Sequence, residues 1–270
     1  MSPGRMTLAA GEVVLVGSDR GGVGKTMVAE TVITRMEAQG VRPMVIEIEA
    51  EPRLMSVLGP DWVRCLRIAA HGPEELERDP GLLYEVWEEL GDAVLGATRP
   101  VVVDLGANLT KALAGYLAEV GDEGPFGTGG GTWFLGVTGG DRFSLNSVNH
   151  GLAYMQQALP ASQRWLVVNE HNPRLQVASD SPVVQRMVKE HGLRGVMRLP
   201  ACTAPTLQGV VDENMRLATA AMHGHEHWVE KGYGVSESRR SVRRLRSFLA
   251  DAMEMLAPIF PEAGQAGDAA

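Results

Sequence analysis

The hydrophobic positions of this chain fall into short uninterrupted runs, and glycine-rich or amphipathic stretches separate one run from the next. Runs without polar alternation are typical of parallel strands that are buried on both faces of a sheet. We predict such strands at residues 13–16, 44–48, 62–68, 100–104, 133–137, 164–169 and 195–200.

Between these runs, apolar residues recur at helical spacing. A helix is predicted over 81–95, in which Leu82, Leu83, Val86, Leu90 and Val94 recur at helical spacing, and Trp87 is expected to pack with them. Further helices are predicted at 27–37, 73–78 and 142–159 (with Asp141 as its N-cap), and around Leu113, Tyr116 and Leu117. The last predicted helix covers 236–257, with Ser236 or Ser238 as its N-cap.

This alternation predicts an α/β fold, in which a mostly parallel sheet carries helices on both faces. We find no internal repeat and no domain boundary, so residues 1–260 are expected to form a single domain. The tail 261–270 has too little apolar surface to order itself. The glycine-rich stretch 121–132 is expected to be a surface loop that serves as a passive connector, and the alternative is a functional flap.

The turn between the first strand and the first helix has the composition of a phosphate-binding loop. It reads Arg20-Gly21-Gly22-Val23-Gly24-Lys25-Thr26, and Met27 opens the helix. Glycines take backbone angles that let successive N–H groups converge on one anion in front of a helix N-terminus. In such a loop the lysine reaches the β- and γ-phosphates and the threonine hydroxyl holds Mg²⁺. We therefore predict nucleotide binding by residues 21–27.

A single aspartate, Asp104, ends the apolar run at 100–104. A carboxylate at the carboxyl end of a strand in this fold faces the phosphate-binding loop across the sheet edge. This is the Walker B pattern, and it makes Asp104 the predicted partner of Thr26 in holding Mg²⁺. The alternative is an ordinary strand that ends in a turn aspartate.

The loop resembles the deviant K-G-G-x-G-K-[ST] loop of the ParA/MinD ATPases. That resemblance implies a P-loop NTPase fold of the SIMIBI type, ATP and Mg²⁺ as ligands, and a homodimer that forms when ATP is bound. It also implies that Arg20, which replaces the early lysine, reaches across the dimer to the partner's nucleotide. Arginine keeps the charge but replaces a point charge with a planar fork. Asp19 departs from the pattern by replacing its first glycine.

After the second predicted strand, Glu49-Ala50-Glu51-Pro52 resembles the D-x-D-P element of the same proteins. The resemblance implies that Glu49 and Glu51 position the attacking water, although each is one methylene longer than aspartate. A water displaced in this way would lower the rate of hydrolysis. The alternative is that Glu47, Glu49 and Glu51 alternate on a solvated strand end.

Later motifs resemble the TraL/StbB subgroup of conjugation and plasmid-stability proteins, over roughly residues 13–220. They are Asp104-Leu105-Gly106-Ala107-Asn108, Tyr116-Leu117, Val137-Thr138-Gly139-Gly140 and Asn169-Glu170. The resemblance implies that Asn169 recognises the adenine edge and that Leu199, Pro200 and Ala201 line the base. The alternative for Asn169 is an Asn-Glu turn.

Composition limits the remaining possibilities. The chain has 21% charged and 44% hydrophobic residues, which is ordinary for a globular protein. Its apolar runs are far shorter than the ~20 residues that a bilayer span needs, so we expect a cytoplasmic protein. Cys65 and Cys202 lack metal-ligand spacing and are expected to act as small apolar residues. The histidines of 223–227 also lack a known metal-site spacing, so an exposed helix end is expected there.

The net charge of −8 argues against nucleic-acid binding by the whole surface, but it does not exclude a local basic patch. Such a cluster opens the last predicted helix: Arg239, Arg240, Arg243, Arg244 and Arg246. It is either a nonspecific DNA contact, as in ParA relatives, or a solvated face behind a core stripe of Val242, Leu245, Leu249, Met253 and Leu256.

The leading hypothesis is a ParA/MinD-like ATP switch that acts in plasmid conjugation, partition or cargo positioning and is a slow ATPase. An alternative is a nucleotide-binding adaptor with little or no hydrolysis. A third is a small-molecule ATP-dependent enzyme that resembles dethiobiotin synthetase. No Asn-Lys-x-Asp guanine motif is visible, which favours ATP over GTP.

Overall fold

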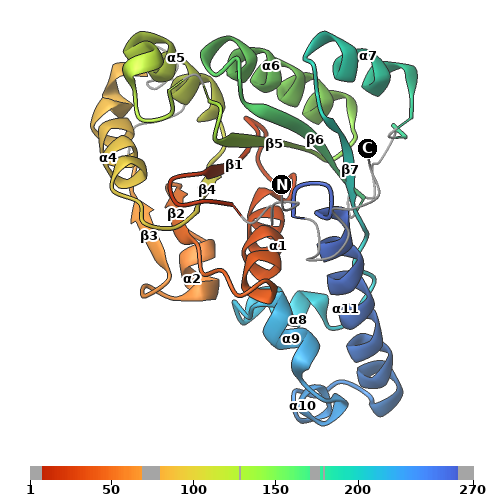
Figure 1. Cartoon of the computed structure of the whole chain (residues 1–270). Helices are drawn as coiled ribbons and strands as arrows, with labels where there is room; N and C mark the ends of the chain where they lie inside the picture. Colours follow the sequence, from red (N-terminus) through yellow and green to blue (C-terminus); the bar gives the residue numbers. More distant parts are fainter. Residues whose placement is uncertain (1–7, 69–79, 128, 171–176, 179, 261–270) are drawn as a thin grey trace, which may run out of the picture.

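The apolar runs form the strands of one parallel sheet in the computed structural model, which describes residues 8–68, 80–127, 129–170, 177–178 and 180–260 (Figure 1). In this described part the sheet has seven strands in the order β3-β2-β4-β1-β5-β6-β7, and every neighbouring pair is parallel. The strands are β1 (Val13–Gly17), β2 (Met44–Ile48), β3 (Val63–Leu66), β4 (Val101–Leu105), β5 (Thr132–Thr138), β6 (Gln163–Asn169) and β7 (Gly195–Leu199). All seven predicted strands are confirmed.

The sheet is buried on both faces, which explains why its strands lack polar alternation. In β1, Val14 and Val16 pack into the core on one face, whereas Val13 and Leu15 pack into the core on the other. Successive side chains of a strand point to opposite faces, so a strand covered on both sides must be apolar throughout.

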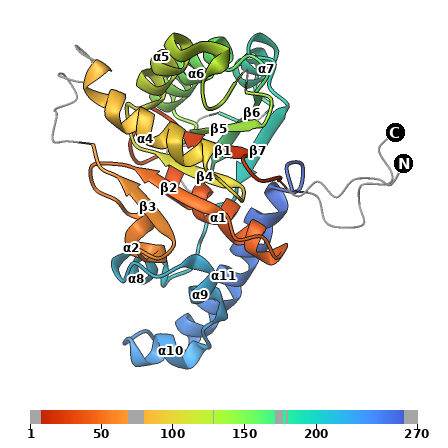
Figure 2. The same ribbon diagram turned by 60° about the vertical axis from the view of Figure 1, so that its left-hand side comes forward.

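Two layers of helices cover the sheet (Figures 1 and 2). One core brings together α1 (Lys25–Ala38), α2 (Leu54–Leu58), α8 (Leu207–Asp212), α9 (Leu217–Met222), α10 (His225–Glu230) and α11 (Val235–Met255). The opposite core is formed with η1 (Pro80–Leu83), α4 (Tyr84–Leu95), α5 (Thr110–Val120), α6 (Arg142–Ala158) and α7 (Pro182–Glu190). Trp87 is buried there, as predicted. The predicted α/β architecture is confirmed.

Two predicted segments fall outside the described residues, and a third does so in part. The helix expected at 73–78 and the tail 261–270 both lie there. In the glycine-rich stretch, η2 (Gly121–Glu123) forms a short turn and Phe126 is buried, while residue 128 lies outside the described residues. Asp141 caps α6 as predicted, because its carboxylate accepts the N–H groups of Phe143 and Ser144.

The start of the C-terminal helix differs from the prediction. We expected Ser236 or Ser238 as N-cap, but α11 begins at Val235 after Gly234, which has no side-chain cap. Ser238 is instead fully buried in the helix, and the buried Ser241 hydroxyl accepts the N–H of Thr206 at 3.2 Å. Ser236 is exposed and Ser238 is buried within the helix, and neither caps it, so the cap prediction is wrong.

The apolar stripe of α11 is also shifted. Val242, Leu245 and Leu256 are buried as predicted, but Phe248 and Ala252 complete the buried face. Leu249 is only partly buried, and Met253 lies outside the core cluster. Figures 1 and 2 show α10 and the start of α11 extending away from the sheet.

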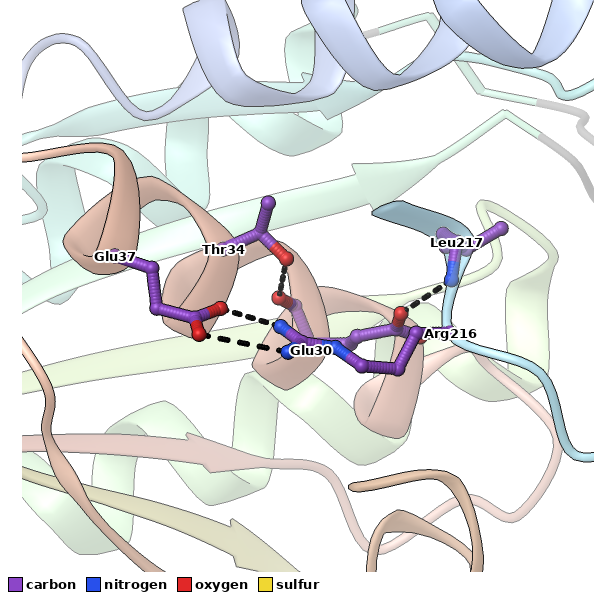
Figure 3. Close-up of polar contacts among 5 residues, drawn as sticks. All are labelled: Glu30, Thr34, Glu37, Arg216 and Leu217. Carbon is purple, nitrogen blue, oxygen red and sulfur yellow. Dashed lines mark hydrogen bonds and ion pairs between the residues drawn. The ribbon is translucent and has the colours of Figure 1, made fainter. Parts of the chain in front are cut away.

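A buried carboxylate joins α1 to the start of α9 (Figure 3). Glu30 accepts the N–H of Leu217 at 2.6 Å, and Thr34 donates its hydroxyl to the Glu30 carbonyl at 2.8 Å. The neighbouring Arg216 forms an ion pair with Glu37. The helix that follows the phosphate-binding loop is thereby connected to the α8–α11 region.

None of the described helices combines the length and the apolar character that a membrane span needs.

Candidate nucleotide-binding site

The loop between β1 and α1 has the backbone of an anion site. Gly22 and Gly24 take left-handed φ angles of 72° and 94°, which side-chained residues avoid. Gly24 is the N-cap of α1, no side chain caps the helix, and its first turn contains no acidic residue. The N–H groups and the positive end of this helix are therefore available for an anion such as a phosphate.

Lys25, the first residue of α1, lies inside the loop. Its side chain is buried, and Nζ donates to the Arg20 carbonyl at 3.1 Å. Burial lowers the pKa of Lys25, and the carboxylates of Asp104, Glu49 and Asp19 oppose this shift. The lysine thus sits among three acidic groups with its ammonium held by a backbone carbonyl, a contact that a phosphate would replace.

Asp104 lies next to the loop, as predicted. It is paired with Val16 of β1 in the register of the sheet, and the Thr26 hydroxyl donates a hydrogen bond to its carboxyl group. Burial raises its pKa to about 7. Its Oδ1 is buried and has no hydrogen-bond partner among the described residues.

An unpartnered buried carboxylate oxygen beside a threonine hydroxyl fits a divalent cation. Mg²⁺ prefers oxygen ligands and takes one or two from the protein, with phosphates and water supplying the rest. The described residues contain no group of three or more His, Cys, Asp or Glu side chains that could hold a metal ion. The arrangement therefore suits a cation bound together with a phosphate.

The acidic residues that follow β2 lie in different environments. Glu49 faces the site: its charge acts on both Lys25 and Asp104, and its Oε2 lies close to Gly106. Its Oε1 accepts the N–H of Ala50 at 3.0 Å. Glu51 is exposed, and no charge effect on Lys25 or Asp104 comes from it.

Glu47 was not singled out as a site residue, and the alternative of a solvated strand end is wrong for it. It is only 1% exposed, and its register partner is Asp104. Its carboxylate accepts the N–H groups that open α2, from Arg53 and Leu54 at 2.7 Å and from Met55 at 2.8 Å. Glu47 thus positions α2 and adds negative charge near Asp104. The sequence signal that could have identified Glu47 is a single acidic residue inside an otherwise apolar strand.

The two residues that depart from the loop pattern, Arg20 and Asp19, point in different directions. Arg20 is exposed, and its charge acts on Asp141 at the start of α6. Asp19 points inward instead: its Oδ1 accepts the N–H of Thr110, the first residue of α5, at 2.9 Å. Asp19 therefore connects the phosphate-binding loop to the segment that follows Asp104, a role that its replacement of glycine did not indicate.

Asn169 lies at the end of β6, buried, and its Nδ2 donates to the carbonyl of Val23 at 2.9 Å. In the register it is paired with Leu199, which is buried, and Pro200 follows. The structure thus brings Asn169 to the phosphate-binding loop with Pro200 close to the same sheet edge. Recognition of adenine by Asn169 and by residues 199–201 stays a prediction.

The basic cluster and the histidines lie in the α8–α11 region. Arg244 donates to the Thr203 carbonyl and Arg246 to the Ala221 carbonyl, both at 2.8 Å. His223 and His227 stack with nearly parallel rings, 3.9 Å between centroids. Because the nitrogen lone pairs lie in the ring planes, stacked imidazoles do not converge on one ion.

A scan of protein-family models and a search of curated proteins found no match to the chain. Several solved structures are similar. MinD cell division protein of Aquifex aeolicus has 14% identity and a TM-score of 0.44, over 87% of this chain and 97% of its own. A nucleotide-binding protein of Archaeoglobus fulgidus in complex with ADP has 15% identity and a TM-score of 0.47, over 76% of this chain and 86% of its own. A plasmid partition protein of Borrelia burgdorferi has 10% identity and a TM-score of 0.41, over 75% and 96%.

At these identities and TM-scores the likeness carries no functional argument, and the functional assignment rests on the residues of the loop and of the sheet edge beside it.

Proposed function

We propose that this protein is a ParA/MinD-like molecular switch that binds ATP and Mg²⁺, forms a homodimer in that state and hydrolyses ATP slowly. The observation that carries the proposal is the convergence of Lys25, Thr26 and Asp104 at a glycine loop whose helix begins without a side-chain cap. The exposed Arg20 in the same loop distinguishes this interpretation from an ordinary P-loop protein.

Each residue has a defined role in this proposal. The N–H groups of residues 21–27 hold the phosphates, and Lys25 leaves the Arg20 carbonyl for the β- and γ-phosphates. Thr26 and Asp104 hold Mg²⁺, directly or through water. When bound, Mg²⁺ offsets the negative charge of the phosphates. Its charge also compensates for the carboxylates around Lys25, so we expect nucleotide binding to require a divalent cation.

The proposed dimer face lies at the exposed side of the loop. Arg20 is exposed there, near Asp141, and the first turn of α6 carries Phe143 with 74% of its surface exposed. Opposite charges beside an exposed aromatic ring support a self-complementary two-fold contact, since each group can meet its counterpart on the second copy. In that contact Arg20 stabilises charge on the partner's γ-phosphate.

Slow hydrolysis, or its absence, follows from Glu49 and Glu51. Glu49 is near the site but bonds to its own next N–H group, and Glu51 is exposed. These positions favour a weak function for Glu49 in positioning water. Glu51 has no such function in the unliganded state. The same observation favours the second candidate function, an adaptor that binds nucleotide without turnover.

For the biological output we propose plasmid transfer, partition or cargo positioning, with DNA as one binding partner. Arg239, Arg240 and Arg243 are exposed on the part of α11 that extends away from the sheet, whereas Arg244 and Arg246 each donate to a backbone carbonyl. We therefore assign the DNA contact to the first three.

The test is nucleotide binding and turnover by the wild-type protein and Lys25→Ala, with Lys189→Ala, at an exposed lysine of α7, as the matched control. Wild type and the control should bind ATP with Mg²⁺ more tightly than GTP, and Lys25→Ala should bind at least about tenfold more weakly. ATP turnover, measured with and without DNA, separates the switch from the adaptor. Wild-type protein that binds neither ATP nor GTP would refute the proposal.

A further inference from the structure

The buried amide of Asn169 makes a contact that nucleotide-base recognition does not require. Its Nδ2 donates to the carbonyl of Val23 at 2.9 Å, a bond between residues 146 positions apart in the chain. β6 is separated from β1 by β5 in the sheet, so the side chain joins the end of β6 to the loop after β1. Asn169 is 6% exposed, which places this bond away from bulk water.

A hydrogen bond to this carbonyl controls the direction of the next N–H group. The described chain has no cis peptide bonds, and in a planar trans peptide the C=O and the following N–H point in opposite directions. With the Val23 carbonyl held by Asn169, the Gly24 N–H must point away from Asn169. The Gly24 carbonyl in turn accepts the N–H of Val28 at 3.0 Å, in the first turn of α1. Gly24 is therefore constrained on both sides.

Asn169 also lies directly against Gly24. A Cβ added to Gly24 would be 2.3 Å from Nδ2 of Asn169, far closer than atoms approach without bonding. This contact and the φ of 94° both require glycine at position 24. The amide thus packs on the residue whose backbone turns the loop into the helix.

We propose that Asn169 is a positioning residue of the phosphate-binding loop: it orients the Gly24 N–H toward the phosphates and contributes to binding whatever base the nucleotide carries. This inference rests on the proposed nucleotide binding and assigns Asn169 to the phosphate end of the ligand. Removing the amide frees the Val23 peptide to rotate, and the loop then has to be ordered by the ligand itself.

The test compares three ligands with Mg²⁺ present: ATP, ITP and inorganic tripolyphosphate. ITP lacks the exocyclic amine of adenine, and tripolyphosphate has no base. Binding to wild type, Asn169→Ala and Asn169→Asp is measured by calorimetry, with thermal unfolding recorded for each variant. Asn149→Ala is the matched control, because it removes a part-buried side-chain hydrogen bond away from the loop, which Asn149 Oδ1 accepts from His191 Nε2 at 2.8 Å.

The expected result is that both Asn169 variants weaken all three ligands by a similar factor, about tenfold for the loss of one hydrogen bond. Asn149→Ala should lower the unfolding temperature and leave all three affinities unchanged. Asn169→Asp keeps the shape of the side chain and serves as the test if the alanine variant does not fold.

Two results would overturn the inference. Weakened ATP binding with unchanged affinity for ITP and tripolyphosphate would assign Asn169 to the adenine edge. Unchanged affinity for every ligand would show that its bond to Val23 has no part in binding. Wild-type protein that binds none of the ligands, or Lys25→Ala that binds them normally, would instead refute the proposed function, which keeps the two failures distinguishable.

Discussion

At the scale of single residues, Asp104 combines a functional position with a local energetic cost. Its carboxyl group is buried and has one oxygen without a partner among the described residues, and two further carboxylates, Glu47 and Glu49, raise its pKa together with burial. A buried polar group that lacks a partner costs about 1–3 kcal/mol. Such a cost is typical of groups that await a ligand.

We predict that Asp104→Asn raises the unfolding temperature of the ligand-free protein by about 2–4 °C, on the scale of ~1 kcal/mol for a chain of this size. The same variant should lose the dependence of nucleotide binding on Mg²⁺. Differential scanning fluorimetry and calorimetry check the two effects, with Asp92→Asn on the exposed face of α4 as control. An asparagine variant that unfolds at a lower temperature would contradict our interpretation of Asp104.

Residue types and their order along the chain were sufficient to predict the loop, Lys25, Thr26 and Asp104, because each follows or precedes an apolar run. The partners of Asp19, Glu47 and Asn169 were not predictable in this way. Their hydrogen bonds go to backbone groups outside their own strand or loop, and a backbone donor or acceptor leaves no signature in the residue type of the partner. Glu47 shows this most clearly, since its partners open a helix that we did not predict.

At the scale of elements, α1 connects the phosphate-binding loop to the C-terminal helices through Glu30. Burial raises the pKa of Glu30 to about 7, while the Leu217 N–H and the charge of Arg216 oppose the shift and Glu37 adds to it. The folded state therefore binds a proton more tightly than the unfolded chain, whose glutamate has a pKa of about 4.3. This contribution to stability is fully present below that value and is lost as the pH rises through about 7.

We predict that Glu30→Gln removes this pH dependence, because its amide oxygen can still accept the Leu217 N–H but does not titrate. The variant should match wild type in denaturant unfolding at about pH 4 and exceed it at about pH 8. Glu85 is an exposed glutamate of α4, and the stability of Glu85→Gln relative to wild type should be the same at both pH values. A variant less stable than wild type at the higher pH would mean that the ionised carboxylate stabilises the junction with α9.

The start of α11 offers a second test at this scale. Ser236 is exposed and caps nothing, so Ser236→Ala should change the free energy of unfolding by less than about 0.5 kcal/mol. Ser241→Ala leaves the buried Thr206 N–H without its acceptor and should cost about 1–3 kcal/mol. Equal effects of the two substitutions in urea unfolding would argue against this packing of α11 on α8. Helical periodicity located the helix, but burial of its serines depends on the neighbouring element.

At the scale of the whole molecule, an acidic protein carries exposed arginines on a helix that extends away from its sheet (Figure 1). If these arginines bind DNA phosphates, replacing Arg239, Arg240 and Arg243 by alanine should weaken DNA binding uniformly across sequences. The slope of log affinity against log salt should fall by about 0.9 for each phosphate that is no longer neutralised. Fluorescence anisotropy over a salt series measures both. Unchanged affinity and slope would leave the arginines as a solvated face.

The central claim concerns the assembly of two copies, and light scattering tests it most directly. The mass in solution is measured without nucleotide, with ADP and with a nonhydrolysable ATP analogue, each with Mg²⁺, for wild type and Arg20→Ala. Our account predicts a doubling of the wild-type mass with the ATP analogue alone. It also predicts an Arg20→Ala variant that binds the analogue but remains monomeric. A wild-type protein that binds the analogue and keeps its monomer mass would contradict the switch, and a variant that still dimerises would remove Arg20 from the mechanism.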